Sequence, residues 1–192
     1  MERWIRRIDL LNKGIGHAFA WCVLVLTAST CWEVVMRYGL NSPTKWAFDM
    51  SYTLYGALFM MAGAYALSRG AHVRGDFIYR KWSQRTQAKV DLVLYVLFFF
   101  PAIFAMVFTG ARYGLDAARI QEVSVNSPAG VPVWPLKSLI FVAGLTLLLA
   151  GVAEVMRCLV CLRTGYWPRR LGDVEELEVV LQEQHQKTGA AQ

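Results

Sequence analysis

Four polar residues beside the first two apolar runs of this sequence could form one cluster. Glu33 and Arg37 are four residues apart, so a helix would place the carboxylate and the guanidinium on one face, where they can pair. Asn41 follows in a short polar turn, and Asp49 begins the next apolar run on the same side. Such a cluster either fixes the hairpin between the two runs or forms a substrate site. We expect the first, because buried and half-buried ion pairs commonly serve structure.

Two histidines allow a different chemistry. His17 lies near the start of the first apolar run and His72 follows the second, so the pair could ligate a haem iron axially between helices. This is the chemistry of a haem- or quinone-associated membrane anchor subunit of a respiratory enzyme, which we keep as the alternative hypothesis. Cys158 and Cys161 supply only two of the four ligands that a structural zinc site requires.

Ionisable residues are absent from the middle of every apolar run. No Asp, Glu, Lys, Arg or His occurs in residues 18–32, 50–68, 92–111 or 138–153. A carrier or pump needs such groups near the middle of the membrane, although each costs about 2.5 to 3.5 kcal/mol on insertion scales. The acids beside the runs are expected to lie near water and headgroups: Glu33, Asp49, Asp91 and Glu154. We therefore expect neither an autonomous transporter nor a small drug-type exporter, which needs a membrane-buried carboxylate.

The sequence also lacks a phosphate-binding loop, a nucleophile elbow and a metal-binding helix motif. We expect no enzyme activity. We also expect no catalytic residue, no cofactor and no metal ligand in this chain.

The elements that position these residues are four apolar runs, at residues 15–36, 46–68, 90–111 and 133–161. At about 1.5 Å of helix rise per residue, each is long enough to cross a bilayer core roughly 30 Å thick. With 56% hydrophobic and 18% charged residues, the chain is too apolar for a soluble domain of 192 residues. The sequence therefore predicts an all-α membrane protein with four transmembrane helices.

Lysine and arginine residues indicate the orientation of these helices. Residues 1–14 contain four, residues 69–89 contain six and residues 157–170 contain four, whereas the other side of the runs has five. The positive-inside rule therefore places both termini and the middle loop in the cytoplasm. The net charge of +6 reflects this topology, and we expect no binding of nucleic acid.

The segments at the two ends of the chain differ from the membrane domain, residues 15–165. In residues 1–14 a helix would gather apolar side chains on one side and cations on the other, which predicts an amphipathic helix lying on membrane lipids. The apolar side comprises Trp4, Ile5, Ile8 and Leu11. Residues 166–192 form an acidic cytoplasmic tail, in which Asp173 opens a short helix.

Small residues recur at seven-residue spacing in the second and fourth runs. They predict a helix-packing face, within the chain or against a partner, made by Gly56, Gly63, Gly144 and Gly151. In the third run, Pro101 is expected to kink or locally unwind the helix.

Several short motifs occur in a fixed order along this topology. They are Met36-Arg37-Tyr38, Trp46 with an acid three residues later, the run from Ser68 to Asp76, and Pro132-Val133-Trp134. In this order, residues 1–165 resemble the small membrane subunit, the DctQ-like component, of tripartite ATP-independent periplasmic (TRAP) transporters.

The resemblance implies a subunit of the bacterial inner membrane that does not itself carry substrate. In that family a large subunit of roughly twelve spans holds the sodium and substrate sites and moves by an elevator-like mechanism. A periplasmic binding protein delivers the substrate, usually an organic acid. The small subunit widens the static scaffold and helps to form the docking surface.

The resemblance also assigns expected roles to individual residues. Arg37, Asn41, Trp46 and Asp49 would fix the outer hairpin, with Arg37 and Asn41 near the docking surface. His72, Arg74 and Asp76 would order the cytoplasmic exit of the second span.

Overall fold

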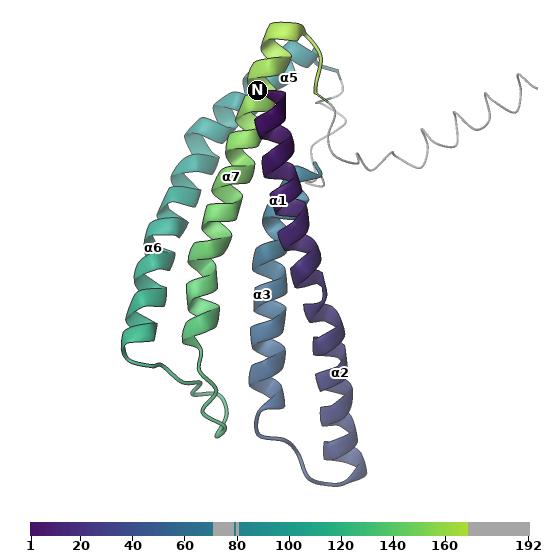
Figure 1. The fold of residues 1–192 in the computed structure, drawn as a ribbon, viewed down its shortest axis with the longest axis vertical. Helices are drawn as coiled ribbons and strands as arrows, with labels where there is room; N and C mark the ends of the chain where they lie inside the picture. The colour runs from purple at the N-terminus through teal and green to yellow at the C-terminus, as the bar shows by residue number, and fades with distance from the viewer. Residues whose placement is uncertain (71–78, 80, 169–192) are drawn as a thin grey trace, which may run out of the picture.

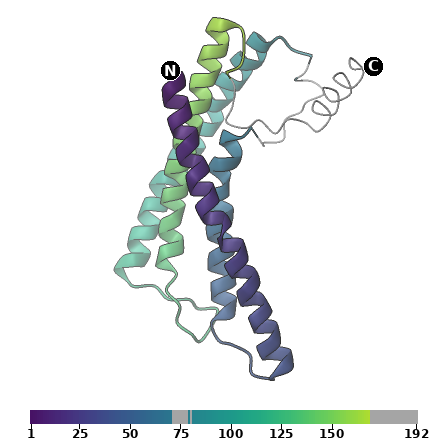
Figure 2. The ribbon, with the colours of Figure 1, turned by 45° about the vertical axis from the view of Figure 1, so that its right-hand side comes forward.

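The computed structural model describes residues 1–70, 79 and 81–168, which form a bundle of long helices (Figure 1, Figure 2). The helices are α1 (Glu2–Ala20), α2 (Cys22–Val34), η1 (Val35–Gly39), α3 (Ala47–Ser68), α5 (Gln84–Leu94), η2 (Tyr95–Phe99), α6 (Phe100–Arg119) and α7 (Trp134–Thr164), with η1 and η2 π-helical. In this part of the chain no strand forms, and one isolated bridge joins Val123 to Pro132. The predicted all-α class is confirmed.

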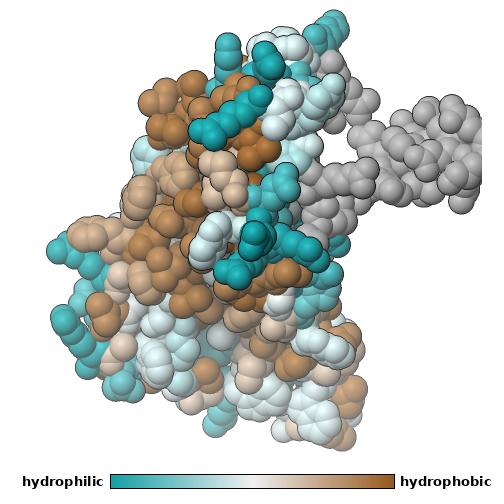
Figure 3. Space-filling model, turned by 45° about the horizontal axis from the view of Figure 1, so that its top comes forward, coloured by the Kyte–Doolittle hydropathy of each residue, from teal (hydrophilic) through white to brown (hydrophobic). Residues whose placement is uncertain are grey.

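Three stretches of the described residues are long and apolar enough to cross a membrane: Glu2–Gly39, Gln84–Arg119 and Trp134–Thr164. The apolar flank between the polar ends of the bundle is visible as a broad brown area in Figure 3. α3 also has the length of a span, with 22 residues, but tyrosines dilute its apolar sequence and it is not one of the three. Its crossing of the membrane stays a prediction.

The first helical stretch is continuous across residue 14, where the sequence suggested a boundary. α1 runs to Ala20, and Trp21 has helical angles, φ −62° and ψ −22°, that lead into α2. The buried stripe of α1 is Ile5, Asp9 and Asn12, which packs against α3 and α7. Trp4, on the expected lipid-facing side, is exposed. α1 therefore contacts the bundle through a stripe that is mostly polar.

Two antiparallel pairs of helices make up the bundle (Figure 1). One pair joins α2 and η1 to α3, the other joins α6 to α7, and α3 packs against α7 where the pairs meet. The first residues of α1 and the last residues of α7 lie together at one end (Figure 1). We call this the inner end, after the predicted topology, and the opposite end, with the loops after η1 and α6, the outer end.

Glycines in α7 allow the close approach of the second pair. A Cβ atom on Gly144 would lie 2.8 Å from Val107 Cγ2, and one on Gly151 would lie 2.3 Å from Phe99 Cε1. Phe99 belongs to η2, which directly precedes Pro101. Proline lacks the N–H that would bond to the carbonyl four residues earlier. The π-helical turn η2 therefore lies where Pro101 was expected to disturb the helix.

The glycines of α3 also face α7. A Cβ atom on Gly56 would lie 3.1 Å from Leu136 Cδ1, and one on Gly63 would lie 3.6 Å from Leu147 Cδ2. All four predicted packing glycines therefore lie against helices of the same chain.

Candidate functional site

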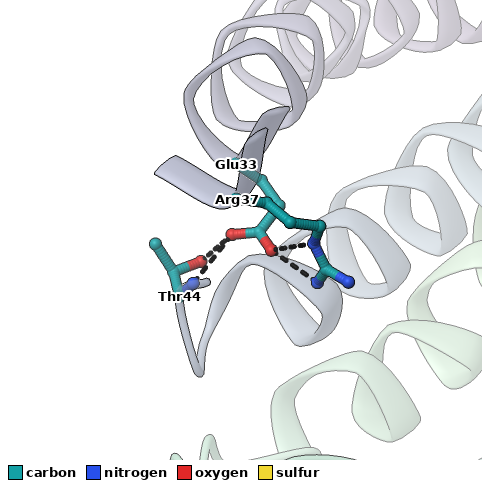
Figure 4. A network of polar contacts seen from close by, with 3 residues as sticks. All are labelled: Glu33, Arg37 and Thr44. Carbon is teal, nitrogen blue, oxygen red and sulfur yellow. Dashed lines mark hydrogen bonds and ion pairs between the residues drawn. The ribbon is translucent and has the colours of Figure 1, made fainter. Parts of the chain in front are cut away.

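The turn between η1 and α3 is closed by one carboxylate. Glu33 Oε1 accepts hydrogen bonds from Arg37 Nε at 2.9 Å and Arg37 Nη2 at 2.6 Å, as Figure 4 shows. Glu33 Oε2 accepts from the backbone N–H of Thr44 at 3.0 Å and from the Thr44 hydroxyl. The predicted pairing of Glu33 with Arg37 is confirmed, and Thr44 is a partner that the sequence did not reveal. The carboxylate thus ties the end of the first helical stretch to the segment that enters α3.

Asn41 and Trp46 shape the same turn through their backbones. Asn41 has φ +51°, in the left-handed region that asparagine tolerates better than most residues. The next residue, Ser42, donates its N–H to the carbonyl of Met36 at 2.9 Å, which closes the end of η1. Trp46 is the residue before α3, and its carbonyl accepts the first hydrogen bond of that helix, from Met50 N–H at 3.0 Å.

Asp49 anchors the other outer loop. Its side chain is buried, with the residue 2% exposed, and accepts hydrogen bonds from Ser124 Oγ at 2.6 Å and from Ser127 Oγ. Ser124 Oγ in turn accepts from the N–H of Asn126 at 3.2 Å. Asp49 was expected in one cluster with Glu33, Arg37 and Asn41; instead the face of α3 that carries it is covered by the loop after α6. The expected cluster is therefore two separate networks.

A further ion pair fixes the base of that loop. Lys137 Nζ lies 2.6 Å from both carboxylate oxygens of Glu122 and 4.2 Å from the centre of the Tyr113 ring. Backbone hydrogen bonds join Ser124 N–H to Val131 O at 2.8 Å and Val133 N–H to Glu122 O at 3.0 Å. The outer loop is thereby held on α3, α6 and α7 together.

The inner end holds a buried ionic cluster of Asp9, Glu154 and Arg157, which we call the inner cluster. The sequence analysis missed it. The Arg157 side chain is fully buried, and its guanidinium donates to Glu154, one turn earlier on α7, and to Asp9 on α1. One turn farther along α1, both polar atoms of the Asn12 amide lack a hydrogen-bond partner in the described part of the chain. The spacing of Ile5, Asp9 and Asn12 on one helix face was the available signal.

Two acids beside the spans, Glu154 and Asp49, were expected to lie in water or among headgroups, and for both this expectation is wrong. Glu154 is 1% exposed and Asp49 is 2% exposed. Protein donors replace water at both carboxylates, which is how buried charges are accommodated. Buried carboxylates, which a small exporter needs, therefore do exist here. Glu154 is held by Arg157 within the same helix, so its geometry is that of a structural ion pair.

Of the other residues singled out in the sequence, the structure describes His17, Cys158 and Cys161. His17 is exposed, its Nδ1 atom lies 2.8 Å from the carbonyl oxygen of Lys13, and its ring meets the Tyr65 ring edge-on at 5.6 Å. His72, Arg74 and Asp76, with most of the acidic tail, lie outside the described residues. Cys158 and Cys161 are buried where α7 packs against α5.

In the part of the chain that the structure describes, no three His, Cys, Asp or Glu side chains are arranged to hold a metal ion. The haem hypothesis thus gains no support from the geometry of His17.

One comparison with known proteins identifies the family. The model for tripartite ATP-independent periplasmic transporters, DctQ component, matches residues 26–161 of the 192. No curated protein matches the chain with a significant score. The matched region runs from α2 through most of α7 and includes the outer networks and both α7 members of the inner cluster, but not Asp9. The chain therefore belongs to the DctQ family, the small membrane component of TRAP transporters.

Proposed function

We propose that this chain is the non-catalytic small permease subunit that scaffolds the large elevator subunit of a TRAP transporter. The complex would lie in the bacterial inner membrane and take up an organic acid that a periplasmic binding protein delivers. The coupling ion, sodium, and the substrate would be bound by the large subunit. Membership of the DctQ family supports the subunit assignment, and the placement of charges supports the division of roles.

The observation that carries the proposal is the way the buried and half-buried carboxylates are used. Glu33 closes the hairpin, Asp49 holds the outer loop, and Asp9 and Glu154 share Arg157. A site that moves an ion or an organic acid must release and rebind its charged cargo within the membrane. The carboxylates here are instead fixed by donors of their own chain, as in a rigid support.

The outer end offers the surface for the binding protein. Arg37 and Asn41 are exposed there, and the Arg37 side chain retains 53% of its accessible surface although it is bonded to Glu33. We place the docking surface on this turn, whose shape Glu33 and Thr44 maintain. The first residues of α1 and the last residues of α7 would then lie on the cytoplasmic side, in agreement with the positive-inside rule.

Purification of the tagged chain from its native membrane in mild detergent tests the proposal. We expect a large permease to co-purify in stoichiometric amount, and uptake of the organic acid to require a sodium gradient. Arg37→Ala should lower uptake without loss of assembly, whereas Asp49→Ala should lower both. Recovery with a flavoprotein or an iron-sulfur subunit, or unchanged assembly and uptake in both variants, would contradict the proposal.

A further inference from the structure

The side of α1 that is turned away from the bundle is cationic. The buried stripe of α1 packs against α3 and α7, so the helix presents its opposite side outward. On that side four cations surround Leu10, which is 48% exposed. All four are exposed, and with Leu10 they make what we call the α1 cationic face: Arg3, Arg6, Arg7 and Lys13.

The α1 cationic face has no counter-charge within the described part of the chain. None of its four cations makes an ion pair there, and Glu2, an exposed acid of the same helix, is paired with none of them. The Cζ atom of Arg7 lies 5.2 Å from the centre of the Trp4 ring, a contact that leaves the positive charge in place. Like charges three and four residues apart on a helix repel each other. The face is therefore suited to an anionic partner.

The extent of the face favours a peptide over lipid headgroups. α1 leads into the stretch Glu2–Gly39, which is long enough to cross a membrane, so its axis runs across the headgroup layer and not within it. Arg3 and Lys13 are ten residues apart, which corresponds to about 15 Å along that axis. The headgroup layer on one side of a bilayer is only roughly 5 to 8 Å thick. An acidic peptide that lies along α1 can meet all four cations together.

An acidic segment of this chain begins at the same end of the bundle. The last residues of α7 lie beside the first residues of α1 (Figure 1). After α7, Gly165 turns the chain with φ +85°, and Trp167 Nε1 donates to Gln87 Oε1 on α5 at 3.3 Å. The residues from 169 onward lie outside the described part of the chain. In the sequence, residues 171–192 contain five acids and one lysine, so their charge is opposite to that of the α1 cationic face.

The tether between the two is long enough for them to meet. α1 packs directly against α7, and the axes of packed helices are about 8 to 10 Å apart. Asp173 follows Pro168 by five residues and Glu183 follows it by fifteen, which allows at most about 18 and 54 Å of extended chain. A tethered partner with such a reach has an effective concentration on the order of millimolar. The acidic segment therefore has an advantage over any free anion of similar charge.

We propose that the acidic segment from Asp173 to Glu183 binds the α1 cationic face of the same chain. The contact joins the two ends of the chain at the inner end and shields this face from other anions. Both partners lie outside residues 26–161, the region that the family model matches, so the contact is a feature of this chain and not of the shared scaffold. The inference does not rest on the proposed function, because it requires neither a large subunit nor transport.

Photo-crosslinking of the full chain tests the location, in phosphatidylcholine nanodiscs that hold one copy each. Benzoylphenylalanine would replace Leu10 or, as a matched control at the same end, Trp82, which is 40% exposed. Trp82 is a stringent control because Gln87 contacts both its carbonyl and Trp167, beside the origin of the acidic segment. We expect adducts with residues 171–192 to be at least fivefold more abundant from position 10 than from position 82. An equal or greater yield from position 82 would overturn the inference.

The lipid composition distinguishes the acidic segment from anionic headgroups. Addition of phosphatidylglycerol to the nanodiscs should change the yield from position 10 by less than twofold. A label that moves from residues 171–192 to the lipid, or that is on lipid from the outset, would overturn the inference and assign the face to the membrane.

Neutral variants test the charge. Replacing Glu175, Glu176, Glu178 and Glu183 together by glutamine keeps the length of the segment and should lower the adduct from position 10 at least fivefold. Lys187→Gln, which removes the one lysine of residues 171–192, is the control and should leave the adduct unchanged or raise it. An unchanged yield in the quadruple variant, or an equal fall in both variants, would overturn the inference. Each of these outcomes leaves the proposed function intact.

Discussion

Replacing Arg157 by methionine removes the cation at the centre of the inner cluster and leaves Asp9 and Glu154 buried beside each other's charge. Removal of one partner from a buried ion pair costs about 3 to 5 kcal/mol, because the remaining charge has lost its compensation. For a protein of this length, about 2 to 4 °C of melting temperature corresponds to each kcal/mol, so the Tm should fall by roughly 6 to 20 °C. The assay is thermal unfolding of the purified chain in detergent, followed by circular dichroism.

A matched control has the same spacing on a helix surface. Asp116 and Arg119 are three residues apart, like Glu154 and Arg157, and lie 3.5 Å from each other with side chains 71% and 76% exposed. Arg119→Met should shift the Tm by less than about 2 °C, because water solvates the remaining acid.

A rescue experiment separates charge from packing. Combining Arg157→Met with Asp9→Asn and Glu154→Gln removes the uncompensated charges and should restore more than half of the lost Tm. Equal Tm values for Arg157→Met and Arg119→Met, or no recovery in the triple variant, would refute the assignment of a buried ionic cluster at the inner end.

Three further predictions concern the other structural features. Asp49→Ala should raise proteolysis of the outer loop several-fold, because two serine hydroxyls lose their acceptor; unchanged cleavage would contradict the anchoring role. Gly151→Ala should destabilise the chain by about 1 to 3 kcal/mol, because its Cβ meets Phe99 at 2.3 Å, whereas Gly63→Ala, with 3.6 Å of space, should be nearly neutral; equal melting temperatures would contradict this packing. Asn12→Leu should leave the Tm unchanged or raise it, since it removes a buried amide without partners, and a large fall would reveal a partner of that amide.

Local spacing made part of this structure predictable. The apolar runs predict helices because each is long enough to cross a bilayer core, where a helix satisfies its own backbone hydrogen bonds. Helix spacing separately predicts that Glu33 meets Arg37, four residues later. The seven-residue spacing of glycines likewise predicts a packing face, although only the structure shows that the neighbours are α6, η2 and α7 of the same chain.

Contacts between distant segments could not be predicted in this way. Asp49 is 75 residues from Ser124, and nothing in the local sequence of either indicates that a loop folds back onto α3. The burial of Glu154 likewise depends on α1 covering α7, and no local pattern on α7 reveals that neighbour. The position of Glu154 near the expected membrane end of the fourth apolar run suggested solvation, but tertiary packing decided its environment.

The link between Asp9 and Arg157 also sets an order for biogenesis. The two residues are 148 positions apart, so at about 5 to 20 residues per second the ribosome needs roughly 7 to 30 s to supply the partner of Asp9. During that interval the first helix presents an acid and an amide to the lipid or to the insertion machinery. A nascent chain that stops before α7 keeps those groups exposed, and it therefore carries a mark by which membrane quality control can distinguish it from the finished subunit.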